Sequence, residues 1–174
     1  MTTALGQAAP DLHILAVLVE NKFGVLARIA GLFSRRGFNI FSLAVAPTDD
    51  EAVSRITIVV DVHNTDVTQI AKQLNKLINV LEISELQPAM SVQRELMLAH
   101  LDEADDKAGL TAVLDQFGGI ILEDDGTGED ASHAVISVSA SPARLDECET
   151  MLRAYGIVEL QRTGRIALPR LDHS

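Results

Sequence analysis

The order of apolar and polar positions along the chain predicts alternating strands and helices. Residues 12–19 form a continuous apolar run of strand length. Apolar residues then recur at the spacing of one helical face: Leu26, Ile29, Ala30 and Phe33. Gly37 is the expected end of this helix, because glycine commonly ends helices. The first quarter of the chain therefore predicts a strand followed by a helix.

The pattern continues with two more strands, a second helix and a fourth strand. Strands are expected at residues 39–46, 55–62 and 80–86, with a turn after the first of them at 47–50. Thr65 is a candidate N-cap for the second helix. The expected buried face of that helix consists of Val67, Ile70, Ala71, Leu74 and Leu77. The order of elements is βαββαβ.

The second half of the chain repeats this order. Strands are expected at residues 94–101, 120–123, 134–139 and 157–162, the last of these being the final strand. One helix should bury Leu110, Val113, Leu114 and Phe117. The other begins at Ser141-Pro142 by the N-cap and N1 preferences and should bury Leu145, Cys148, Leu152 and Tyr155. An acidic loop at 124–132 separates the two middle strands.

Two successive βαββαβ units predict an α+β protein made of two tandem ferredoxin-like sandwiches. Each has two helices over one face of a four-stranded antiparallel sheet, with its first and third strands in the centre. We expect residues 1–10 to be a flexible tail, 11–88 to be the first domain and 89–174 to be the second.

Composition and charge restrict the kinds of partner that the protein could bind. The 174 residues are 47% hydrophobic but only 3% aromatic, so the cores should be aliphatic. The net charge of −11 argues against binding to nucleic acid or acidic membranes, which requires clustered lysine and arginine. No apolar run reaches the roughly 20 residues of a membrane span, and the start lacks the pattern of a signal peptide. We expect a soluble, cytoplasmic protein.

The most informative stretch is residues 20–28, where an apolar strand passes into a helix through a turn that contains Gly24. The first turn of a helix has unpaired N–H groups and binds small anions such as a carboxylate. Asn21 and Asn39 would place two amides near this helix N-terminus, which suits an amino-acid zwitterion. The leading hypothesis is an amino-acid sensor. Simpler interpretations remain open: Asn21 as a helix N-cap, Gly24 as a turn residue and Asn39 as a cap beside Gly37.

Other chemistry has weaker support. The sequence contains no Ser-His-Asp signature, GxSxG, Walker loop or GxGxxG, and no arginine-bearing phosphate loop after the first strand. The histidines are scattered singly, at His13, His63, His100, His133 and His173, which does not favour a metal site. The acidic residues at 123–125 and 129–130 are expected to be a solvated hairpin tip, and the single Cys148 a core residue.

Two phrases of the first half are highly specific: Leu32-Phe33-Ser34-Arg35-Arg36-Gly37-Phe38-Asn39-Ile40 and Ala46-Pro47-Thr48. Through them the sequence resembles the ACT domain of the acetohydroxyacid synthase small regulatory subunit. Further matches lie at residues 19–21, 24–26, 54–57, 72–77 and 94–98, so that the resemblance covers nearly the whole chain.

The resemblance implies a homodimeric, non-catalytic subunit that activates a large catalytic partner and confers feedback inhibition by valine in branched-chain amino-acid synthesis. Thiamine diphosphate, Mg and FAD would reside on that partner. The implied effector residues, at a dimer interface, are Asn21, Gly24, Val25, Leu26, Asn39 and Ile40. One protomer would supply Asn21 and the backbone of Gly24 and Val25, and its neighbour Asn39 and Ile40. The alternative is a free-standing ACT sensor that regulates another enzyme or a transcription factor.

Overall fold

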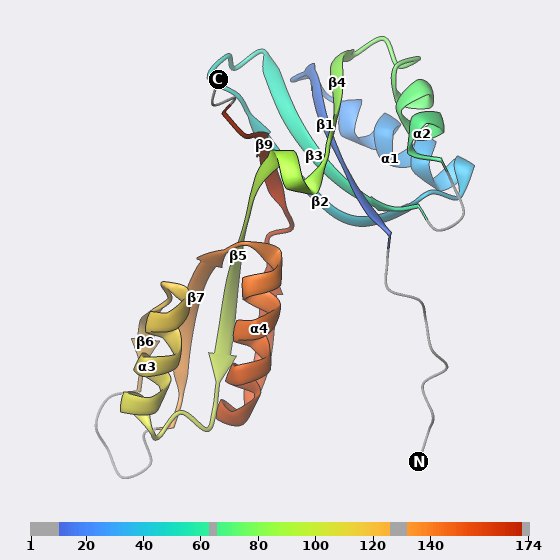
Figure 1. The fold of residues 1–174 in the computed structure, drawn as a ribbon. Coiled ribbons are helices and arrows are strands. Elements are labelled where there is room, and N and C mark those ends of the chain that lie inside the picture. The colour runs from blue at the N-terminus through green and yellow to red at the C-terminus, as the bar shows by residue number, and fades with distance from the viewer. Residues whose placement is uncertain (1–10, 63–65, 126–131, 172–174) are drawn as a thin grey trace. The chain divides into compact units, whose positions relative to one another are not determined.

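The computed structural model describes residues 11–62, 66–125 and 132–171, and these form two compact units (Figure 1). Of these described residues, the first unit contains those up to Val92 together with those from Ala167 onward, and the second contains those between Gln93 and Ile166. The expected boundary at 88/89 therefore lies close to the observed one. The residues from Ala167 onward, expected in the second domain, belong to the first unit.

The first unit is a ferredoxin-like sandwich. Its elements are β1 (Leu12–Glu20), α1 (Val25–Arg36), β2 (Asn39–Pro47), β3 (Val53–Asp61), α2 (Val67–Leu74) and β4 (Val80–Leu86). The strands form an antiparallel sheet in the order β2-β3-β1-β4, with both helices on one face (Figure 1). The predicted fold and the central position of the first and third strands are confirmed.

Helix α1 lies between two left-handed glycines, Gly24 with φ 82° and Gly37 with φ 70°. Gly37 donates its N–H to carbonyls of the last turn, where Arg35 and Arg36 complement the negative end of the helix dipole. The buried residues of α1 are Val25, Ile29, Leu32 and Phe33. The predicted face is therefore wrong at Leu26 and Ala30, which are exposed. The predicted residues and the buried residues both recur at helical spacing. The buried series starts one residue earlier, at Val25, and packs on the sheet.

The second helix, α2, begins one residue later than expected. Asp66 is its N-cap, and the carboxylate of Asp66 accepts the N–H of Thr68 at 2.8 Å. Thr65, the predicted cap, lies outside the described residues. Leu77 follows the end of the helix and packs, partly buried, against the core. The predicted helix was therefore too long at its C-terminal end, because α2 ends at Leu74.

The two faces of the first sheet are covered differently. The helices cover one face, and the core beneath them includes Leu15, Val17, Phe33, Ile58, Ile70 and Leu74. The other face carries Ile14, Ala16, Val59 and Leu86, and these pack against Ala167, which is 4% exposed. Ala167 belongs to strand β9 (Ile166–Pro169), whose following residue, Arg170, donates its N–H to Met90 O at 2.9 Å. This short strand was not predicted.

The second unit repeats the sandwich. Its elements are β5 (Ser91–Leu101), α3 (Lys107–Phe117), β6 (Ile120–Asp124), β7 (Ala134–Ala140), α4 (Pro142–Leu152) and β8 (Ile157–Arg162), with a 3₁₀ turn at Arg153–Tyr155. Another 3₁₀ turn, at Pro88–Met90 in the first unit, precedes β5. The strand order is β6-β7-β5-β8, and β9 pairs with β5. Ser141 is the N-cap of α4 with Pro142 in its first turn, as predicted. Within the described ranges, no helix combines the length and apolar character needed to cross a membrane.

The C-terminal strand provides a test of how the first unit is held together. Replacing Ala167 with aspartate should lower the free energy of unfolding by roughly 2–4 kcal/mol, because a carboxylate would be buried among Ile14, Val59 and Leu86. Leu168→Asp is the matched control, since Leu168 is 56% exposed and its substitution should change stability by less than about 0.5 kcal/mol. Denaturant unfolding measures both, and equal effects would contradict the observed packing.

Candidate functional site

The candidate site is the turn between β1 and α1. Gly24 adopts φ 82° and ψ −7° as the N-cap of α1, a left-handed conformation that a residue with a Cβ enters only with strain. No side chain among the described residues caps this helix, and its first turn contains no acidic residue. A helix N-terminus of this kind, with the positive end of its dipole, is a feature that can bind a small anion.

Asn21 is held beside this turn by two hydrogen bonds. Its backbone N–H donates to Ala52 O at 2.7 Å, and its side-chain Nδ2 donates to Glu51 O at 2.9 Å. These bonds tie the site to the turn between β2 and β3. Asn21 is therefore not the N-cap of α1, and its side-chain oxygen Oδ1 is the atom suited to accept from an ammonium group.

The other predicted residues differ in what they expose. Val25 is 4% exposed with its side chain in the core, and its backbone N–H donates to Lys22 O at 3.3 Å. Leu26 is 43% exposed at the start of the helix. Ile40 is half-buried against the core, and Asn39 is exposed as the first residue of β2. Because Gly37 is the C-cap of α1, the interpretation of Asn39 as that cap is wrong.

Strand register separates the two asparagines of one chain. Asn39 pairs with Asp61 at one end of β3, and Val53, at the other end, pairs with Glu20, the residue before Asn21. The length of β3 is about 27 Å at the usual rise per residue. The expectation that both amides of one chain lie near the same helix N-terminus is therefore wrong. The structure brings together Asn21, Gly24, Val25 and Leu26 but not Asn39 and Ile40.

Asn79, which sequence reasoning missed, links the site to β4. Its side-chain Oδ1 accepts Arg28 Nη1 at 2.6 Å, and its Nδ2 donates to Glu20 Oε2 at 2.5 Å. Lys22 Nζ donates to the other oxygen of Glu20 at 3.0 Å. The bond from Asn79, followed by that from Lys22, lowers the pKa of the Glu20 carboxyl. Asn79 is 51 positions from Arg28 and 59 positions from Glu20 in the sequence, so no local pattern indicates these contacts.

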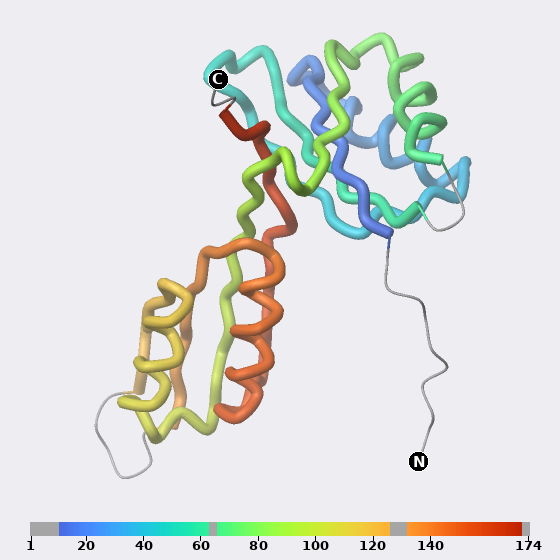
Figure 2. Tube along the Cα trace, in the orientation of Figure 1, coloured from blue at the N-terminus to red at the C-terminus, as the bar shows by residue number. Residues whose placement is uncertain are grey.

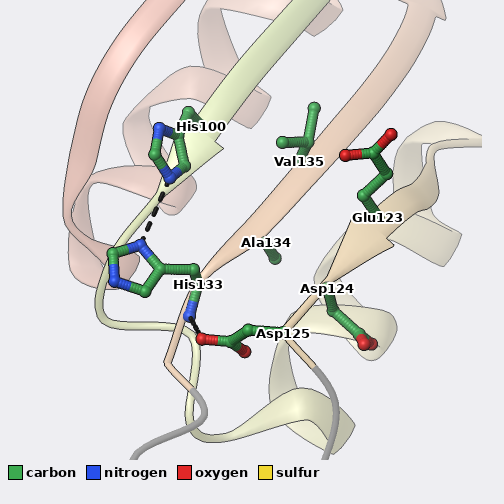
Figure 3. A pocket seen from close by; sticks show the side chains of 7 residues that line it. All are labelled: His100, Glu123, Asp124, Asp125, His133, Ala134 and Val135. Carbon is green, nitrogen blue, oxygen red and sulfur yellow. Dashed lines mark hydrogen bonds between the residues drawn. The ribbon is translucent and has the colours of Figure 1, made fainter.

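Two histidines of the second unit that are far apart in the sequence lie together in the structure. His100 Nε2 and His133 Nδ1 are 3.2 Å apart, in a pocket also lined by acidic residues of β6 and its following turn (Figure 3). Asp125 accepts the backbone N–H groups of His133 and Ser132, and the first of these bonds is the main cause of its lowered pKa. No three His, Cys, Asp or Glu side chains group as metal ligands in the part of the chain that the structure describes.

The acidic loop is described only at its ends. β6 ends at Asp124 and β7 begins at Ala134, so this segment connects two paired strands, as a hairpin does. Glu129 and Asp130 lie outside the described residues.

The single cysteine lies in the core of the second unit. Cys148 is 0% exposed, and burial raises the pKa of its thiol to about 11. A neutral thiol that is buried in an apolar core is a poor nucleophile, because the thiolate is the reactive form. Cys148 therefore packs as the small core residue that its place in the helical pattern predicted.

The sandwich and the glycine turn at the start of α1 define the class of the first unit, which is an ACT domain. Residues 15–82 match the family described as "AHAS small subunit-like ACT domain", and residues 94–171 match "Small subunit of acetolactate synthase". The chain belongs to the acetolactate synthase small-subunit family.

Individual relatives agree with the family models. The chain is 43% identical over 159 residues to a probable acetolactate synthase small subunit of Archaeoglobus fulgidus, covering 91% of this chain and 96% of that protein. It is 40% identical to the acetolactate synthase small subunit of Mycolicibacterium smegmatis, covering 91% of each. The crystal structure of the Thermotoga maritima acetolactate synthase small subunit superposes with a TM-score of 0.81 at 29% identity, covering 92% of this chain and 98% of that one.

Burial of Cys148 predicts its chemical reactivity. With a pKa of about 11, only about one thiol in a thousand is ionised at a pH near 8, and the folded protein shields that fraction too. We expect a chromogenic disulfide reagent to leave the native protein unmodified and to titrate one thiol per chain after denaturation. Rapid modification of the native protein would show that the thiol is accessible and would contradict the core assignment.

Proposed function

We propose that this chain is a non-catalytic regulatory subunit that activates the large catalytic subunit of acetolactate synthase and makes it sensitive to inhibition by valine. Branched-chain amino-acid synthesis in the cytoplasm is the corresponding pathway. The observation that carries the proposal is the uncapped N-terminus of α1 beside Asn21, in a chain whose two units both match this subunit. Thiamine diphosphate, Mg and FAD would belong to the catalytic partner.

The proposal includes a homodimer formed through β2. This strand is at one edge of the first sheet, and an unpaired edge is a liability that pairing with a second copy would cover. In an antiparallel pair, the Asn39 end of one β2 lies beside the Pro47 end of the other. Pro47 pairs with Ser54, which pairs with Val19, at the end of the sheet where α1 begins. Dimer formation would therefore bring Asn39 and its neighbour Ile40 to the partner's Asn21.

This arrangement accounts for each part of an amino-acid ligand. The N–H groups of the first turn of α1 would bind the carboxylate. Oδ1 of Asn21 and the amide of Asn39 from the second copy would accept the ammonium group. The exposed part of Leu26 and the second copy's Ile40 would contact the aliphatic side chain. Valine supplies all three groups, and a site shared by two copies makes ligand binding favour the dimer.

A free-standing sensor would need only the first unit to carry out its function. In this chain the second unit also matches the acetolactate synthase small subunit, over residues 94–171. That match supports a role with the synthase over the regulation of an unrelated enzyme or of a transcription factor.

Valine affinity tests the site. Asn21→Ala, Asn39→Ala and Gly24→Asp should each weaken valine binding by roughly tenfold or more, because they remove a hydrogen bond to a charged ligand or place a carboxylate against its own. Titration calorimetry measures the affinity, and circular dichroism checks the fold. Asn75→Ala, an exposed asparagine at the end of α2, is the matched control. Wild-type affinity in all three site variants would exclude this site.

Enzyme assays separate activation from inhibition. With the purified large subunit, the wild-type chain should raise the rate of acetolactate formation, and added valine should reduce that rate. Asn39→Ala should retain the stimulation and lose the inhibition, because it removes ligand contacts without removing the contact with the partner. The valine titration should use the full-length chain, since deleting residues from Ala167 onward would uncover Ile14, Ala16 and Val59. No stimulation by the wild-type chain would contradict the regulatory assignment.

A further inference from the structure

The two most exposed large apolar side chains lie at one end of the first unit. Among the described residues, Phe23 is 107% exposed and Ile78 is 89% exposed, relative to a reference state, and no other large apolar side chain is as exposed. Phe23 lies in the turn between β1 and α1, and Ile78 lies in the turn between α2 and β4. Isolated exposed apolar residues are ordinary, but two at one place are a candidate contact surface.

Hydrogen bonds fasten the two turns to each other. Glu20 N–H donates to Asn79 O at 2.9 Å, and the Asn79 side chain bonds to both Glu20 and Arg28. Asn79 directly follows Ile78, and Lys22, which pairs with Glu20, directly precedes Phe23. Figure 2 shows both turns at the same end of the sheet. The backbone that carries the two apolar side chains is therefore already ordered, which reduces the entropy that a binding partner must overcome.

The sheet edge that carries Ile78 differs from the edge that would pair in the proposed dimer. β4 is the edge strand opposite β2 in the order β2-β3-β1-β4, and Ile78 lies two residues before β4. Phe23 directly precedes Gly24, so it is attached to the turn that would hold the effector carboxylate. Phe23 therefore adjoins the proposed effector site, and Ile78 lies beside the sheet edge that the proposed dimer leaves unpaired.

We propose that Phe23 and Ile78 form a docking surface for the large catalytic subunit of acetolactate synthase. The inference rests on the proposed function, since it assigns a place to the partner that a small subunit of this synthase implies. An aromatic and an aliphatic anchor are the residue types that dominate interface energetics. The charged neighbours of this surface, Glu20, Lys22 and Arg28, are already paired with one another or with Asn79.

The position also suggests how an effector reaches the enzyme. A ligand changes a partner only through different affinities for two states, and that requires a physical connection between the two sites. Here the connection is the backbone from Phe23 to Gly24. Occupation of the first turn of α1 would alter the turn on which Phe23 stands, and so the contact with the large subunit.

The test uses Phe23→Ser, Ile78→Ser and the double variant in the full-length chain. The double variant should bind the purified large subunit at least about tenfold more weakly and stimulate it correspondingly less at limiting concentration. Because both side chains are exposed, the thermal unfolding midpoint should match that of the wild type. Valine affinity and dimer mass by ultracentrifugation should also be unchanged. Leu171→Ser is the matched control, with Leu171 at 81% exposure, and should bind the large subunit like the wild type.

The possible results are distinct. Wild-type affinity of the double variant for the large subunit would overturn the docking surface and leave the proposed function intact. Equal weakening by Leu171→Ser would also overturn it, because the effect would then not be specific to this surface. Loss of the dimer in the double variant would identify the surface as a contact between copies of this chain. Failure of the wild-type chain to bind the large subunit would overturn both the proposed function and the docking surface.

Discussion

The antiparallel register of β1, β3 and β2 is the constraint on which the rest of the first unit depends. In register, Leu15, Val17 and Ile58 face the helices, whereas Ile14, Ala16 and Val59 face β9. A slip of one residue would exchange these two faces. The same register sets Asn39 and Asn21 at opposite ends of the sheet, so that a site using both must be completed by a second copy. One set of backbone hydrogen bonds thus defines the core and the proposed effector site together.

The N-terminus of α1 combines three features within a few residues. Gly24 forms the left-handed turn at the start of α1, Asn21 is held by the β2–β3 turn, and Phe23, between them in the sequence, is fully exposed. Asn79 and Glu20 stabilise this arrangement from the β4 side. A proposed effector site and a proposed docking surface therefore share one short, ordered segment, which is the physical requirement for transmitting a binding event over a short distance.

The second unit has the same fold with different chemistry. It holds nine of the chain's eleven net negative charges, its core contains a buried thiol at Cys148, and its helix α3 begins at an aspartate cap, Asp106, in place of a glycine turn. Its buried Glu95 pairs with Arg162 at 2.6 Å, which connects β5 to β8. Fold alone does not define function, and the contrast between the units is the reason for proposing the effector site in the first.

The sequence by itself determined the fold class, the order of the two units and most strand and helix positions. Each element buries one face, so its apolar residues repeat at a spacing that a short stretch of sequence already shows. The sequence also indicated the Gly24 turn, since that signal lies within a few residues. Tertiary structure decided what depends on distant partners: which row of α1 is buried, the Asn79 bonds to Glu20 and Arg28, the meeting of His100 with His133, and the packing of β9. β9 has only four residues, which is too few to show a repeat of apolar positions. Its Ala167 is buried because it packs on a face of the first sheet, and only the tertiary structure shows this.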